Sequence, residues 1–201
     1  MIAESYRGHV WVGKAENVHH ALDDNGVRVD TPDTSLKKGT AARKGWWLTD
    51  SVNKGVPYQW GGFDTPESFD KKLKEGFYAG DVYTTAKREA LYDGVSELAC
   101  GIDCSGFISR CWRLERAYST RELPAICKKL DSFSDLKAGD LVNRHNVHAL
   151  LFERFVDETE NEMLAYQTGS APSWKVLRYK VSVDYLKSMG YQAYRYKNMQ
   201  E

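Results

Sequence analysis

The chain has 201 residues, which suits one compact domain with an extension, or at most two small domains. Its 28 Lys and Arg residues equal its 28 Asp and Glu residues, so the whole chain lacks the basic field typical of nucleic-acid-binding proteins. No apolar run approaches the roughly 20 residues that a membrane-spanning helix needs. We therefore expect neither a nucleic-acid partner nor a membrane span, and no motif indicates a cofactor or a resident metal.

Residues 1–38 are expected to form an N-terminal arm or a small β extension. Residues 7–13 and 26–30 resemble short strands, and the turn former Asp24-Asn25-Gly26 separates them. His19 and His20 lie in this extension without an evident local partner, so we expect them at the surface. The first residues also lack the basic and apolar regions of a signal peptide.

Residues 39–201 are expected to form the main domain, with residues 63–100 as a polar helical insertion packed on it. A first helix is predicted over residues 40–54, where Trp47, Leu48 and Val52 would pack. Thr65-Pro66 is a typical helix start, because Thr caps free backbone N–H groups and Pro fits the first turn. A further helix is predicted over residues 82–92.

The second half of the chain changes from helices to strands. Cys104, Phe107, Ile108 and Cys111 recur at helical spacing, so they share one face of a helix that starts at Asp103. A short helix is predicted over residues 123–130 and another over 183–189. Apolar, aromatic and β-branched segments predict five strands, at residues 140–142, 147–155, 162–168, 174–181 and 191–196. Helices followed by an antiparallel meander indicate an α+β fold.

Cys104 stands where a helix start would activate a thiol. The helix dipole places roughly half a positive charge at this end, which favours the nucleophilic thiolate over the thiol. Gly106 leaves room for a substrate chain, and the free N–H groups of the first turn can receive an oxyanion. Cys104 is therefore the candidate nucleophile.

His148 is the candidate base, because it opens an apolar strand that would hold the imidazole rigidly and partly away from water. His145, in the polar turn before that strand, is the alternative. Gln167 lies in the following strand, where its amide oxygen could accept the imidazole N–H and fix the tautomer. An ordinary exposed strand Gln is the other interpretation of Gln167.

Four segments in this order resemble the NlpC-type cell-wall cysteine peptidases, which are papain-like α+β enzymes. They are Pro-Tyr-Gln-Trp-Gly-Gly from Pro57, Asp-Cys-Ser-Gly from Asp103, Gly139-Asp140 and the strand that His148 opens. The resemblance covers roughly residues 45–196. It implies a nucleophile at Cys104, a base at His148 and a third polar residue at Gln167. About forty residues separate Gly62 from Asp103, where the family has a shorter link.

The resemblance further implies hydrolysis of amide bonds in bacterial peptidoglycan stem peptides, commonly between D-γ-glutamate and a diamino acid. Tyr58, Trp60, Asp103 and Ser105 would contact the peptide. The location implied is extracellular or in the cell envelope, although the lack of a signal peptide leaves the cytoplasm open.

Three alternatives use the same residues. Cys100, Cys104, His145 and His148 offer four ligands of the kinds that zinc binds, although the two pairs lie some forty residues apart. An inactive binding module of the same fold would keep Cys104 and His148 while the insertion 63–100 blocks the groove. A papain-like amide or acyl hydrolase with a substrate outside peptidoglycan would use the same Cys–His chemistry.

Overall fold

A computed structural model describes residues 2–199 of the chain. The chain packs into two compact units. The first comprises the chain up to Asp103 together with Thr168–Val176, and the second comprises Cys104–Gln167 together with the chain from Leu177 onward. The expected extension 1–38 and insertion 63–100 both fall within the first unit.

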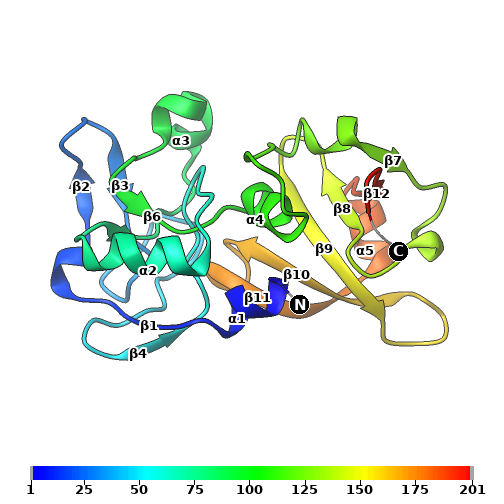
Figure 1. The fold of residues 1–201 in the computed structure, drawn as a ribbon, viewed down its shortest axis with the longest axis horizontal. Coiled ribbons are helices and arrows are strands. Elements are labelled where there is room, and N and C mark those ends of the chain that lie inside the picture. Colours follow the sequence, from blue (N-terminus) through cyan, green and yellow to red (C-terminus); the bar gives the residue numbers. More distant parts are fainter. Residues whose placement is uncertain (1, 200–201) are drawn as a thin grey trace. The chain divides into compact units, whose positions relative to one another are not determined.

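The protein is an α+β protein, as the sequence predicts (Figure 1). Over residues 2–199 the helices are α1 (Ile2–Gly8), α2 (Pro66–Lys74), α3 (Thr85–Ala90), α4 (Cys104–Cys111) and α5 (Val183–Ser188). Short 3₁₀ helices are η1 (Ala15–Asn17), η2 (Leu91–Gly94), η3 (Leu123–Ile126) and η4 (Phe133–Asp135). The strands of the first unit are β1 (Val10–Val12), β2 (His20–Leu22), β3 (Arg28–Asp30), β4 (Val52–Lys54), β5 (Tyr78–Ala79) and β6 (Ala99–Cys100). The remaining strands are β7 (Cys127–Lys129), β8 (Leu141–Arg144), β9 (His148–Phe155), β10 (Glu162–Gly169), β11 (Lys175–Ser182) and β12 (Gln192–Tyr196).

Helix α2 begins where the sequence predicts. The Thr65 hydroxyl accepts a hydrogen bond from Ser68 N at 3.1 Å, and the Ser68 hydroxyl accepts one from Thr65 N at 2.8 Å. This reciprocal capping satisfies two backbone donors that the helix itself leaves unpaired. Phe69 and Leu73 are buried on one face of the helix, which packs against β6.

The helix predicted over residues 40–54 is wrong. This segment has no helix before β4. Its backbone N–H groups donate hydrogen bonds to residues far away in the sequence, and not to the residues four positions earlier as in a helix. Trp46 N donates to Pro32 O at 2.7 Å, and Trp47 pairs with Asp33 in a short parallel bridge. A Cβ atom at Gly45 would lie 1.6 Å from Asp33 O, so only glycine permits this approach. Tertiary pairing has therefore overridden the local helical pattern.

The N-terminal strands exist but pair differently from the expected hairpin. The turn after Leu22 joins β3 to β2, a strand that the sequence did not reveal. Strand β1 instead pairs with β4, with Val12 opposite Val52. The predicted turn is correct, but the strand that precedes it is β2 and not residues 7–13. A strand of three residues such as β2 has almost no periodic signal in the sequence.

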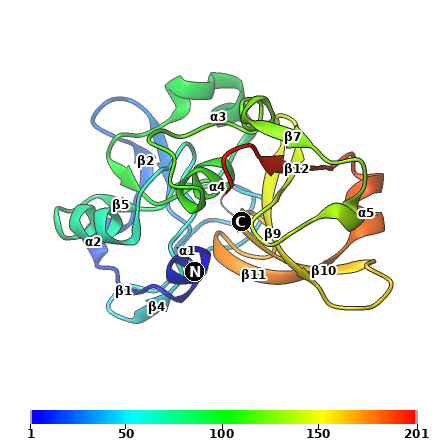
Figure 2. The same ribbon diagram turned by 45° about the vertical axis from the view of Figure 1, so that its right-hand side comes forward.

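The second unit is organised around an antiparallel sheet of six strands with the order β11-β10-β9-β8-β12-β7. Strands β8 to β11 form the predicted meander, and α5 leads from β11 into β12, as Figure 2 shows. Strand β12 returns to pair with β8 through Ala193 opposite Val142. The helix predicted over residues 123–130 is only partly correct, because η3 gives way to β7 at Cys127.

The core of the second unit lies on the sheet face that carries Leu150 and Phe152. Met163 and Ala165 of β10 and Leu186 of α5 pack with them. Helix α4 packs against β9 (Figure 1). Two of its side chains, Phe107 and Ile108, are fully buried. The start of α4 and the strand of His148 therefore belong to the same compact unit.

Over residues 2–199, no helix is long and apolar enough to cross a membrane.

Trp47→Ala should lower the free energy of unfolding of the first unit by about 3–5 kcal/mol, because it removes a large core side chain. Trp47 is fully buried, and its Nε1 donates to Ala79 O at 3.1 Å. Urea denaturation followed by circular dichroism measures this loss. The adjacent Leu48→Ala is the control, since Leu48 is 51% exposed and should cost much less. Equal losses for both variants would contradict this packing.

Candidate active site

Cys104 is the first residue of α4, and its side chain is partly exposed. The other three cysteines differ in environment. Burial raises the pKa of the Cys127 thiol to about 12, and it raises the pKa values of Cys100 and Cys111 well above the ordinary range. These three therefore stay protonated and poorly nucleophilic at neutral pH. Cys104 is the cysteine whose position suits nucleophilic chemistry.

His148 is the first residue of β9, as expected, and its ring is partly buried. Burial lowers the pKa of this imidazole to about 4, and the hydrogen bond to Gln167 opposes that shift. The ring is thus neutral at neutral pH and able to accept a proton. His145, the alternative base, lies in the exposed turn before the strand.

Gln167 lies on β10, and its side chain is only 2% exposed. Its Oε1 is 2.7 Å from His148 Nε2. The register places Tyr166 opposite Leu151, so Gln167 comes opposite Leu150, on the same sheet face as His148 and diagonal to it. Because an amide oxygen only accepts hydrogen bonds, Nε2 carries the proton and Nδ1 keeps its lone pair. The structure therefore brings Gln167 to the second ring nitrogen of His148 and fixes the tautomer.

Tyr191 connects Cys104 to this region. Burial raises the pKa of the Tyr191 phenol to about 12, and a negative charge at Cys104 raises it further, whereas Arg144 lowers it. The pKa of this phenol thus responds to the charges of both Cys104 and Arg144. Arg144 is directly opposite His148 in the β8–β9 register. Arg144 and His148 therefore lie side by side at the end of β8 and the start of β9.

The four expected substrate contacts do not fall in one unit. Tyr58, Trp60 and Asp103 belong to the first unit, and Ser105 belongs to the second. Tyr58 is 5% exposed and packs on Trp174 at a ring distance of 5.3 Å. Trp60 Nε1 donates to Leu91 O at 3.1 Å. Their roles toward a substrate stay predictions.

The four residues of the zinc alternative are not gathered into a ligand set. Within residues 2–199, no group of three or more His, Cys, Asp or Glu side chains is placed to hold a metal ion. Cys100 is buried in β6 of the first unit, whereas His145 lies in an exposed turn of the second.

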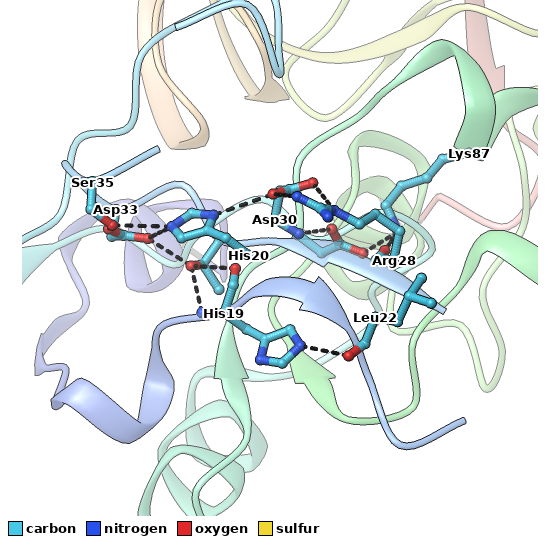
Figure 3. A network of polar contacts seen from close by, with 10 residues as sticks. His19, His20, Leu22, Arg28, Asp30, Asp33, Ser35 and Lys87 are labelled. Carbon is cyan, nitrogen blue, oxygen red and sulfur yellow. Dashed lines mark hydrogen bonds and ion pairs between the residues drawn. The ribbon is translucent and has the colours of Figure 1, made fainter. Parts of the chain in front are cut away.

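A second polar cluster lies in the first unit (Figure 3). The expectation that His20 lacks partners is wrong, because its ring lies between two buried carboxylates. Its Nδ1 is 3.3 Å from Asp30 Oδ1, and its Nε2 is 3.0 Å from Asp33 Oδ2. His19 stacks on Tyr78 with ring centroids 4.0 Å apart. Each histidine is thus a structural element of the folded unit.

Lys87 and Asp81 form the buried ion pair at the edge of this cluster, with Nζ 2.6 Å from Asp81 Oδ2. Lys87 Nζ also donates to Arg28 O at 2.5 Å and to Gly94 O at 2.9 Å. Burial raises the pKa of Asp81, and the charge of Lys87 opposes this. Asp81 Oδ1 accepts from Asp30 N at 3.1 Å, so the pair ties α3 to β3. Its groups are occupied within the fold, which indicates a structural role.

Sequence reasoning missed Arg144 and Tyr191 as members of the candidate site. Arg144 stands four residues before His148, across a polar turn. This spacing is typical of two residues that pair across a β-hairpin, so the sequence could have indicated Arg144. No comparable signal existed for Tyr191, because β12 reaches β8 only through tertiary packing.

Comparison of the chain with protein-family models, with curated proteins and with solved structures found no match.

Lowering the pH should destabilise the second unit through His148. An imidazole with a folded pKa of about 4 and an ordinary value of 6.5 contributes stability above pH 6.5, which is lost as the pH falls toward 4. Urea unfolding at several pH values should show this loss in the wild type and less of it in His148→Gln. His145→Gln is the matched control and should keep the wild-type slope. If the free energy of unfolding depends on pH in the same way in all three proteins, His148 does not have the lowered pKa described above.

Lys87→Met should cost the first unit about 3–5 kcal/mol at pH 8, because it leaves the Asp81 carboxylate buried without its cation. The loss should be smaller at pH 5, where Asp81 is more readily protonated, and adding Asp81→Asn should recover part of it. Urea unfolding at both pH values measures these effects. The exposed Lys74→Met is the control; a loss no larger than the control's would contradict this account.

Proposed function

We propose that the protein is a papain-like cysteine hydrolase of the NlpC type that cleaves an amide bond in peptidoglycan stem peptides. The bond would join D-γ-glutamate to a diamino acid. The observation that carries the proposal is the 2.7 Å hydrogen bond from His148 Nε2 to Gln167 Oε1, in the same unit as a cysteine at a helix start. The substrate class comes from the motif resemblance, and it would place the protein at the cell envelope of a bacterium.

The first half of the reaction forms an acyl-enzyme. Nδ1 of His148 takes the proton of the Cys104 thiol, and the sulfur attacks the carbonyl carbon of the amide. The Cys104 N–H and a neighbouring donor hold the oxyanion. His148 then gives its proton to the leaving amine as the C–N bond breaks.

The second half regenerates the enzyme. Neutral His148 removes a proton from a water molecule, which attacks the thioester carbonyl. The C–S bond breaks, the carboxylic acid leaves, and Cys104 recovers its proton from His148. Gln167 takes no proton in this scheme. It holds the ring so that Nδ1 keeps its lone pair toward the reacting atoms.

Incubation of the wild type with L-Ala–D-γ-Glu–diaminopimelate, followed by mass spectrometry, should show cleavage at the γ-glutamyl bond. Cys104→Ala and His148→Ala should lose turnover while remaining folded. Gln167→Ala should lose roughly 10- to 100-fold, as is usual for groups that orient a functional histidine. Cys127→Ala is a matched control and should retain activity.

Three outcomes would separate the alternatives. Full activity of Cys104→Ala would disprove the mechanism. No cleavage by the wild type, with Cys104 still labelled rapidly by iodoacetamide, would keep the hydrolase and move the search to other amides or esters. No cleavage and no rapid labelling would favour the inactive binding module.

A further inference from the structure

Arg144 is the last residue of β8 and stands directly opposite His148 in the antiparallel register. Side chains of directly opposed residues lie on the same sheet face, with Cβ atoms about 4.5–5.5 Å apart. The turn that joins the strands is closed by a hydrogen bond from Val147 N to Arg144 O at 3.0 Å. The hairpin therefore holds Arg144 and His148 as neighbours on one face of the sheet.

Within residues 2–199, the guanidinium of Arg144 has no carboxylate partner. Three arginines of the second unit pair with carboxylates: Arg178 with Glu153, Arg195 with Asp140 and Arg116 with Glu122. Across residues 2–199, the side chain of Arg144 forms no such ion pair, and it is partly exposed. A guanidinium in this position retains its bidentate donors for a group from outside the chain.

Tyr191 links Arg144 electrostatically to the candidate nucleophile. Gln192, the first residue of β12, pairs with Asn143, and Tyr191 directly precedes it in the chain, as Arg144 directly follows Asn143. The Tyr191 phenol interacts electrostatically with both Arg144 and Cys104. Arg144 is thus paired with the base in the β8–β9 register, and it shares with Cys104 an electrostatic effect on Tyr191.

We propose that Arg144 binds a carboxylate of the substrate close to the amide bond that Cys104 attacks. This inference rests on the proposed function of Cys104 and adds a selectivity that the function alone does not contain. A γ-linked glutamyl residue carries such a group, because the linkage uses its side-chain carboxyl and leaves the α-carboxylate free. Amidation of that carboxylate removes the charge and the two acceptors that a guanidinium recognises, so the enzyme should discriminate against the amidated peptide.

Alkylation of Cys104 by a charged and a neutral reagent tests this electrostatic subsite without needing the natural substrate. Iodoacetate carries a carboxylate next to its reactive carbon, and iodoacetamide carries an amide in the same place. The ratio of the two rate constants, measured at Cys104 by peptide mapping at low ionic strength, should fall roughly 3- to 30-fold in Arg144→Gln, as expected for one charge a few ångströms away. Arg144→Lys keeps the charge and should keep most of the ratio.

Arg154→Gln is the matched control, because Arg154 is exposed on β9 and should leave the ratio unchanged. An unchanged ratio in Arg144→Gln, with Cys104 still labelled, would overturn the carboxylate subsite and leave the nucleophile standing. No labelling of Cys104 by either reagent would overturn the proposed function, and the subsite with it.

The peptide substrate gives a second, independent measurement. The wild type should cleave L-Ala–D-γ-Glu–diaminopimelate faster than the same peptide with its glutamyl α-carboxylate amidated. Arg144→Gln should reduce this preference by the same factor as the alkylation ratio, through slower cleavage of the free-acid peptide. A preference that Arg144→Gln leaves intact would contradict the assignment of Arg144.

Discussion

The hydrogen bond between Gln167 Oε1 and His148 Nε2 fixes which ring nitrogen of His148 is free to accept a proton. It joins β9 and β10 on the sheet face that also carries the core, so the ring cannot turn without disturbing the packing beside it. The proposed chemistry depends on this constraint, because a histidine in the other tautomer would present an N–H to the thiol. Burial of the ring adds the second requirement, since it keeps the imidazole neutral.

The surrounding sheet explains why several ionisable groups meet at one place. Strand β8 lies between β9 and β12, so Arg144 stands opposite His148 on one side, and its neighbour Asn143 pairs with Gln192 on the other. The two hairpin residues are close for a local reason, which is the short turn between them. Tyr191 lies between α5 and β12, and β12 reaches β8 from a distant part of the chain. One end of the sheet thus combines a base, a cation and a phenol from separate segments.

The first unit is organised on a different principle. Its strands have two or three residues, and its core contains large aromatic side chains whose N–H groups donate to backbone carbonyls, as Trp46 does to Trp174 O and Trp47 to Ala79 O. Buried charges are also compensated locally, with Lys87 on Asp81 and His20 between Asp30 and Asp33. Such a unit depends on long-range contacts more than on local propensity. This is the reason why the segment 40–54, with a plausible helical pattern, is not helical.

The sequence alone determined the features that have a local cause. Thr65-Pro66 predicted the start of α2, the apolar spacing after Asp103 predicted α4, and the alternating aromatic segments predicted the strands from β8 to β12. Cys104, His148 and Gln167 could be singled out because each stands at a recognisable point of such an element. Tertiary structure alone decided the pairing of β1 with β4, the partners of His20, and the electrostatic link of Tyr191 to Cys104 and Arg144. Capping and periodicity act within a few residues, whereas strand pairing and burial join residues that the sequence keeps far apart.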